Sequence, residues 1–156
     1  MKYIYTILFL FLSIISIAHE IVSGKVVKVA DGDTITILTA DFIQIKIRLH
    51  GIDCPEKSQD FGTKAKQFTS DQCFGKAVIV KITDTDRYGR SIGVVTLPNG
   101  KTLNKELLKA GLAWHYKHYD QSKEYSDLEI SARNKKIGIW SIPNAVAPWD
   151  FRRSGK

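Results

Sequence analysis

Cysteine, proline and glycine are scarce in this chain of 156 residues, and each scarcity excludes a class of protein. Two cysteines are too few for a disulfide-built miniprotein or for a zinc site made of four thiolates. With 4 prolines and 11 glycines, the composition is not that of a collagen-like or disordered chain. The sequence also lacks internal repeats, linkers and low-complexity tracts. Because 44% of the residues are apolar and 25% are charged, we expect one compact domain with its own core.

Acidic residues are outnumbered by basic ones, 16 against 23, which gives the chain a net charge of +7. An excess of this size favours an anionic partner, such as nucleic acid, an acidic membrane surface or a polyanionic glycan. The same excess also serves plain solubility, so composition alone leaves both interpretations open.

A long apolar run occurs only at the N-terminus, where Ile4–Ile17 follows the positive charge of Lys2. Small residues then stand at the spacing that signal peptidase requires, and we predict cleavage after Ala18. Residues 1–18 would be a signal peptide and residues 19–156 the mature domain, secreted or periplasmic and without a membrane partner. The alternative is a protein anchored in the membrane by an uncleaved leader.

Alternating polar and apolar residues predict five strands, and apolar residues at helical spacing predict three helices. The expected strands lie at 22–29, 34–37, 43–49, 77–83 and 91–97, and the expected helices at 61–75, 103–111 and 122–136. Short strands with helices inserted between and after them predict an α+β, mainly β domain: a five-stranded OB-fold barrel with three helices.

Three polar segments, residues 31–34, 48–56 and 86–90, fall where predicted strands end or turn. Each has an ordinary structural explanation: an aspartate–glycine turn, a solvated strand face, and loop charges. Together, however, they supply three carboxylates and two guanidinium groups. A hard divalent cation prefers oxygen ligands, a carboxylate can accept a proton from water, and arginine matches the geometry of phosphate. The combination therefore favours metal-assisted hydrolysis of a phosphodiester.

The same segments, followed by Gly111-Leu112-Ala113, resemble the staphylococcal nuclease family in order and spacing. The resemblance covers about residues 21–141, nearly all of the mature chain, and leaves 142–156 as a basic tail. It implies an OB-fold phosphodiesterase of the micrococcal endonuclease type. Such an enzyme uses Ca²⁺ to hydrolyse DNA and RNA and cleaves the 5′ P–O bond to leave 3′-phosphates. Since no base-reading element is visible, we expect no sequence preference, and we expect a monomer.

The resemblance also assigns roles around the metal. Asp33 and Asp53 would bind Ca²⁺ through their carboxylates and Cys54 through its backbone carbonyl, while Asp31 would support these ligands from behind. Glu56 would activate or orient the attacking water.

The remaining roles concern the substrate. Arg48 and Arg90 would hold the scissile phosphate and its transition state. Tyr119 matches an aromatic residue that packs near the nucleotide in relatives, and Tyr88 belongs to the same basic loop as Arg90.

Three departures from the best-known family member stand out. Cys54 replaces a threonine, which keeps a backbone carbonyl but loses a hydroxyl. The stretch 57–60 is much shorter than the corresponding loop, so substrate access would differ. The segment 114–116 is more aromatic than its counterpart, and its role in substrate binding is open.

Other metal or nucleophile sites fit the sequence less well. An EF-hand that started at Asp31 would need glutamate at its twelfth position, which is Phe42. The zinc pattern of His115 and His118 lacks a well-spaced third ligand. No general base is placed for Cys54 as a nucleophile. Export would, however, permit a disulfide between Cys54 and Cys73, although nothing in the sequence brings them together.

Two features stay open. Trp114, Tyr116 and Tyr119, interleaved with basic residues, suit base stacking on single strands, but the same rings could close the barrel against its helices. The tail 151–156 would add nonspecific attraction to phosphate or form a solvated end. The alternative to an enzyme is a non-catalytic OB module that binds nucleic acid, which would not need the five charged residues of the proposed site.

Overall fold

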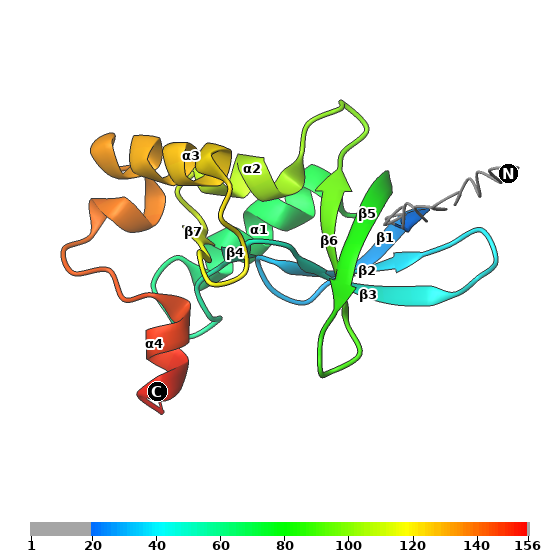
Figure 1. Ribbon diagram of the computed structural model, residues 1–156, viewed down its shortest axis with the longest axis horizontal. Coiled ribbons are helices and arrows are strands. Elements are labelled where there is room, and N and C mark those ends of the chain that lie inside the picture. Colours follow the sequence, from blue (N-terminus) through cyan, green and yellow to red (C-terminus); the bar gives the residue numbers. More distant parts are fainter. Residues whose placement is uncertain (1–19, 156) are drawn as a thin grey trace, which may run out of the picture.

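Five strands close into a barrel in the computed structural model, which describes residues 20–155 (Figure 1). Neighbours around the barrel are β1-β2-β3-β6-β5, and all pairs are antiparallel except β3 with β6. This mixed barrel with its helices confirms the predicted α+β, OB-type fold. The elements are β1 Ile21–Val29, β2 Thr34–Leu38, β3 Gln44–Leu49, β4 Ile52–Asp53, α1 Gly62–Cys73, β5 Ala77–Thr85, β6 Ser91–Thr96, α2 Leu103–Lys109, β7 Trp114–His115, α3 Lys123–Asn134, a 3-10 turn Gly138–Ser141 and α4 Pro148–Arg153.

The barrel interior is filled by every second residue of its strands. In β2 and β3 the fully buried apolar side chains are Ile35, Ile37, Ile47 and Leu49, whereas Lys46 is exposed. This is the alternation that the sequence predicts, and one apolar face is enough to fix the register of the strands. Three leucines of α2, at positions 103, 107 and 108, extend the same core beneath the helices.

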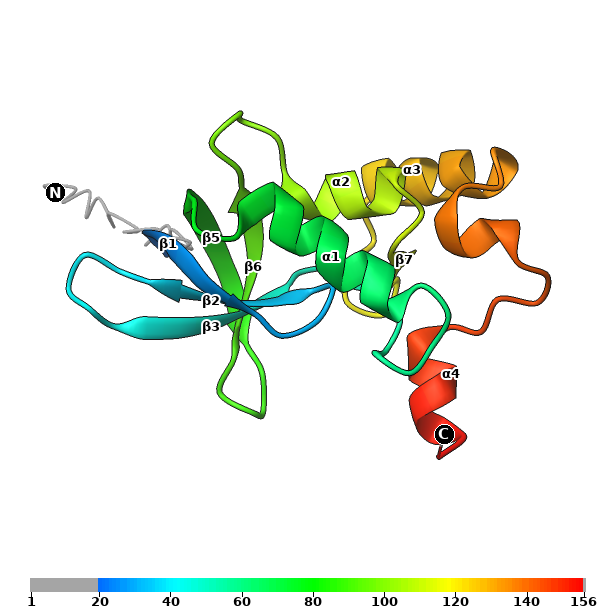
Figure 2. The same ribbon diagram turned by 180° about the vertical axis from the view of Figure 1, so that it is seen from behind.

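The three predicted helices are present as α1, α2 and α3. Ser122 caps α3 as expected, since its hydroxyl accepts a hydrogen bond from the Tyr125 N–H at 3.3 Å. A fourth helix, α4, lies in the tail whose role the sequence left open, and residues 152–155 at its end are exposed. Figure 1 and the reverse view in Figure 2 show α4 standing apart from the other three helices at the C-terminus.

A small second sheet connects the barrel to this helical side. It forms where β4, directly after β3, pairs with β7, so that Asp53 lies opposite Trp114. Gly51 permits the turn between β3 and β4, because its φ of +70° favours glycine and an added Cβ would lie 2.8 Å from the Cβ of Asp120. No helix within residues 20–155 is long and apolar enough to cross a membrane. The predicted leader, residues 1–18, lies outside the described residues.

Candidate active site

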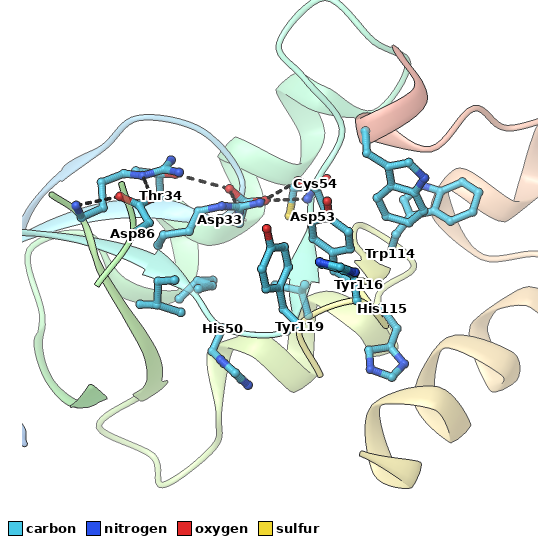
Figure 3. A pocket seen from close by; sticks show the side chains of 18 of the residues that line it. Asp33, Thr34, His50, Asp53, Cys54, Asp86, Trp114, His115, Tyr116 and Tyr119 are labelled. Carbon is cyan, nitrogen blue, oxygen red and sulfur yellow. Dashed lines mark hydrogen bonds and ion pairs between the residues drawn. The ribbon is translucent and has the colours of Figure 1, made fainter. Parts of the chain in front are cut away.

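One open cleft of about 1690 Å³ runs along the barrel where β2 begins and β3 ends (Figure 3). Its wall continues through the β5–β6 turn, the segment after β7 and α4. Every residue that the sequence predicted for the site lines this cleft: Asp31, Asp33, Arg48, Asp53, Cys54, Glu56, Tyr88, Arg90 and Tyr119. The structure therefore places the predicted residues together, while their individual roles stay proposals.

Two buried carboxylates, those of Asp33 and Asp53, meet at the side chain of Arg48. The β2–β3 pairing aligns Thr34 with Arg48, and the Leu49 N–H donates to the Asp33 carbonyl at 2.8 Å. Arg48 forms an ion pair with Asp33 through Nη1, and its Nη2 lies 2.6 Å from Asp53 Oδ1. The two carboxylates are only 6% and 1% exposed. Buried charges of this kind need a cationic partner, and Arg48 supplies one guanidinium for both.

Backbone contacts fix the position of Asp33. Its Oδ2 accepts a hydrogen bond from the Cys54 N–H at 2.6 Å, and its own N–H donates to Asp31 Oδ1 at 3.2 Å. A Cβ on Gly32 would lie 2.7 Å from the Cys54 Cβ and 2.8 Å from the Ala65 Cβ. The glycine between the two aspartates thus allows their loop to pack closely against Cys54 and α1. This close packing is a second role for Gly32, in addition to the turn that the sequence predicted.

The loop after β4 brings Glu56 to the edge of the cleft, where its side chain is 37% exposed. The Glu56 N–H donates to Gln59 Oε1 at 2.8 Å, which folds the loop back on itself. A Cβ on Gly62 would overlap the Glu56 carbonyl, so glycine is required where α1 begins. Sequence inspection noted that this loop is short but missed Gln59 and Gly62 as the residues that hold it.

Arg90 reaches the cleft from the β5–β6 turn. Its Nε donates to Asp86 Oδ2 at 2.6 Å and its backbone N–H donates to Asp86 Oδ1 at 3.0 Å. Partial burial raises the pKa of Asp86, but the hydrogen bonds from Arg90 and Tyr88 outweigh it and leave that pKa below its ordinary value. The exposed ring of Tyr88 lies beside this pair, with its centroid 5.6 Å from the Arg90 guanidinium carbon.

Arg152 of α4 also enters the site, although the sequence analysis treated it only as part of the basic tail. Its Nη2 lies 2.7 Å from Asp53 Oδ2 and its Nη1 lies 2.7 Å from Glu56 Oε1. Partial burial lowers the pKa of this guanidinium, but the hydrogen bonds that it donates to the two carboxylates outweigh burial and raise that pKa above its ordinary value. The contact joins residues 99 positions apart, which no local motif encodes.

The aromatic residues near the cleft divide between packing and exposure. Trp149 stacks on Tyr116 with ring centroids 4.9 Å apart and an interplanar angle of 13°, and Trp114 packs edge-on against both Trp140 and Trp149. Tyr119 touches Tyr116 edge-on but is 62% exposed. Among these rings, Tyr119 is therefore the one with a face available to a nucleotide base.

The histidines have other commitments. His115 is 3% exposed, and its ring nitrogens lie 2.8 Å from Asp120 Oδ1 and 3.2 Å from Ser126 Oγ. The ring of His118 lies edge-on against Tyr119 instead. Partial burial raises the pKa of Asp120. The hydrogen bonds that Asp120 accepts from Ser122 and His115 outweigh this effect and hold that pKa below its usual range.

The donor set of the site nevertheless suits a hard cation. Within residues 20–155 no three His, Cys, Asp or Glu side chains gather into a complete metal site. Two carboxylates do converge, and the backbone of Cys54 is joined to one of them. A cation that takes oxygen ligands can complete its coordination with carbonyl oxygens, water and substrate, as hard divalent cations do. The residues present therefore fit the expected ion.

Both cysteines are buried and free, so the disulfide that export would permit is not formed. Burial raises the pKa of the Cys54 thiol well above its usual value. Burial also raises the pKa of Cys73 to about 11, and the thiol of Cys73 donates to the Thr69 carbonyl at 3.0 Å. Because the thiolate is the nucleophilic form, neither residue suits covalent catalysis.

Comparisons with known proteins agree with this geometry. Residues 46–142 match the family model described as "Staphylococcal nuclease homologue". The chain is 40% identical over 140 residues to "Protein ParB" of Escherichia coli, and the aligned residues cover 83% of this chain and 78% of that protein. It is 39% identical over 143 residues to a "Micrococcal nuclease" of Shigella flexneri, covering 85% and 82% of the two chains. An "Uncharacterized endonuclease" of Haemophilus influenzae is 39% identical over 151 residues, covering 97% and 84%. The chain belongs to the staphylococcal nuclease family of phosphodiester hydrolases.

Proposed function

We propose that this protein is an exported, Ca²⁺-dependent nuclease that hydrolyses DNA and RNA without sequence preference and leaves 3′-phosphate ends. The observation that carries the proposal is the pair of buried carboxylates, Asp33 and Asp53, bridged by Arg48 beside Glu56 in an open cleft. A module that only bound nucleic acid would gain nothing from burying two carboxylates in the surface that faces polyanionic substrate.

Asp33, Asp53 and the Cys54 carbonyl would hold the Ca²⁺ ion, with Asp31 orienting the Asp33 backbone. Bound there, the ion would polarise the phosphoryl oxygen and offset its charge.

The protein's own groups carry the remaining steps. Glu56 would accept a proton from the attacking water, whose oxygen forms a new bond to phosphorus as the bond to the 5′ oxygen breaks. The leaving 5′ oxygen takes up a proton from solvent, and the phosphate stays on the 3′ oxygen. Arg48 and Arg90 would bind the equatorial oxygens, because a guanidinium offers two parallel donors where the transition state gathers negative charge.

Two further parts of the proposal rest on the sequence and the cleft. The apolar leader with its small residues before position 19 supports export. The open cleft with the exposed rings of Tyr88 and Tyr119 supports binding of unpaired bases without base-specific hydrogen bonds.

The test is a nicking assay on supercoiled plasmid, with an RNA substrate in parallel, in Ca²⁺ and in a chelator. We expect both substrates to be cleaved, and we expect the chelator to abolish this cleavage and Ca²⁺ to restore it. A polymerase should extend the 3′ ends of the DNA products only after a phosphatase has removed their 3′-phosphates. Products with free 3′ hydroxyls would refute the direction of cleavage. Retained binding without any cleavage in Ca²⁺ would favour the non-catalytic OB module, and restoration by Zn²⁺ alone would indicate a different metal site.

A further inference from the structure

The C-terminal helix α4 is anchored to the rim of the cleft. Trp149 in its first turn stacks on Tyr116, and Pro148 at its start is buried. Just before the helix, the Val146 carbonyl accepts a hydrogen bond from Gln59 Nε2 at 3.1 Å. Gln59 is the same side chain that accepts from the Glu56 N–H, so one glutamine ties the Glu56 loop to the segment that leads into α4. The helix is thus held by residues at the rim of the cleft.

This anchoring directs Arg152 into the ion-pair cluster, whereas its neighbour Arg153, which also lines the cleft, stays outside that cluster. Arg152 spreads its guanidinium across Asp53 and Glu56, both at 2.7 Å. Arg153 instead pairs with Asp150 on its own helix and is 75% exposed. The two residues have equal charge, and only Arg152 contacts the proposed metal ligand and the proposed base.

The balance of charge shows what Arg152 does in this cluster. The cluster contains three negative charges, on Asp33, Asp53 and Glu56. It contains two positive charges that form ion pairs with them, on Arg48 and Arg152. A divalent cation bound at Asp53 needs oxygen atoms that Arg152 now holds. The cation and the guanidinium of Arg152 therefore compete for the carboxylate of Asp53. A guanidinium released from Asp53 needs another anion whose two oxygens can accept its parallel N–H groups. The substrate backbone provides such anions.

We propose that Arg152 is a third phosphate-binding arginine of this site, which neutralises Asp53 and Glu56 in the free protein and transfers to a substrate phosphate when the cation binds. The inference rests on the proposed function, since it takes the cation and phosphate of that site as given. In this proposal, α4 binds the stretch of substrate backbone that leaves the cleft on the side of Glu56.

The test compares Arg152→Gln with Arg152→Lys, and uses Arg153→Gln as a control for the loss of one charge from the same helix. Calorimetric titration with Ca²⁺ in the absence of nucleic acid measures the competition directly. Because the released ion pairs are partly exposed, we expect Arg152→Gln to bind Ca²⁺ about 5- to 30-fold more tightly than the parent protein. Arg153→Gln should bind like the parent.

Steady-state cleavage of a short single-stranded oligonucleotide in saturating Ca²⁺ measures the second half. Loss of a phosphate contact should raise KM about 10-fold or more in Arg152→Gln with a smaller change in kcat, and Arg152→Lys should recover part of it. Circular dichroism in the near ultraviolet checks that the Trp149–Tyr116 stack is kept.

The outcomes separate this inference from the function beneath it. A parent protein that neither binds Ca²⁺ nor cuts would refute both. A parent that cuts, with Arg152→Gln unchanged in Ca²⁺ affinity and KM, would refute the role of Arg152 alone. Tighter Ca²⁺ binding with an unchanged or lower KM would show that Arg152 only blocks the site, and this too would overturn the proposal.

Discussion

Replacement of Arg48 by lysine tests the central feature of the site, one guanidinium shared by two buried carboxylates. A lysine has a single ammonium group and can satisfy only one of them. Asp53 keeps Arg152 as a partner, so the carboxylate left without a cation would be that of Asp33, which is 6% exposed. Breaking a buried ion pair costs several kcal/mol, and we expect Arg48→Lys to lower the free energy of unfolding by about 2–4 kcal/mol.

Arg90→Lys is the matched control, because Arg90 belongs to the same cleft but pairs with a single carboxylate and is 25% exposed. Its loss should cost about 0–1 kcal/mol. For a domain of this size, 1 kcal/mol corresponds to about 3–5 °C in Tm, so Arg48→Lys should melt about 6–20 °C below the parent protein and Arg90→Lys close to it.

Scanning calorimetry of the three proteins in chelator measures these differences. Saturating Ca²⁺ should then narrow the gap for Arg48→Lys, because the cation replaces the missing positive charge beside Asp33. Equal losses of Tm in the two variants, or an Arg48→Lys protein as stable as the parent, would refute the argument that the shared guanidinium stabilises the fold.

Three further changes test other parts of the molecule. Glu56→Ala should lower kcat on plasmid by about 10²–10⁴-fold with little loss of Tm, because its side chain is half-exposed, and unchanged turnover would remove it from the mechanism. Gly32→Ala should lower the free energy of unfolding in urea by about 1–3 kcal/mol, since its Cβ would overlap Cys54 and Ala65, and a neutral effect would contradict the close approach of this loop to those two residues. The pKa of Cys73 is about 11 in the folded protein, against 9.0 in the unfolded chain, so between these pH values the folded protein keeps a proton that the unfolded chain loses. Cys73 should therefore lower the free energy of unfolding by about 1.4 kcal/mol per pH unit between pH 9.0 and 11. The variant Cys73→Ala should lack this slope. An identical slope in the variant would show that other groups cause the alkaline loss.

Much of the site follows from local patterns. The alternation in β2 and β3 fixes which residues face the core, and this in turn places Arg48 and Thr34 side by side on the two strands. The clusters at residues 31–34, 48–56 and 86–90 lie at strand ends, which a small barrel brings to one edge. Strand periodicity and turn residues are short-range properties, so they can be recognised without knowledge of the tertiary structure.

Other features depended on contacts between distant segments. The loop glycine Gly62, the double role of Gln59 and the docking of Trp149 on Tyr116 all depend on which surfaces meet after folding. The fate of Trp114 was open for the same reason, since an aromatic residue in a basic segment suits either a core or a base.

The sequence alone determined the barrel, its three principal helices and the list of charged residues that share one cleft, because each depends on periodicity or on residues near one another in the chain. Only the tertiary structure decided that the tail forms a helix and that Arg152 holds Asp53 and Glu56. The physical reason is that an ion pair across 99 positions is selected by the geometry of the folded cleft and by the need of buried carboxylates for a cation. Neither condition leaves a periodic trace in the residues around Arg152.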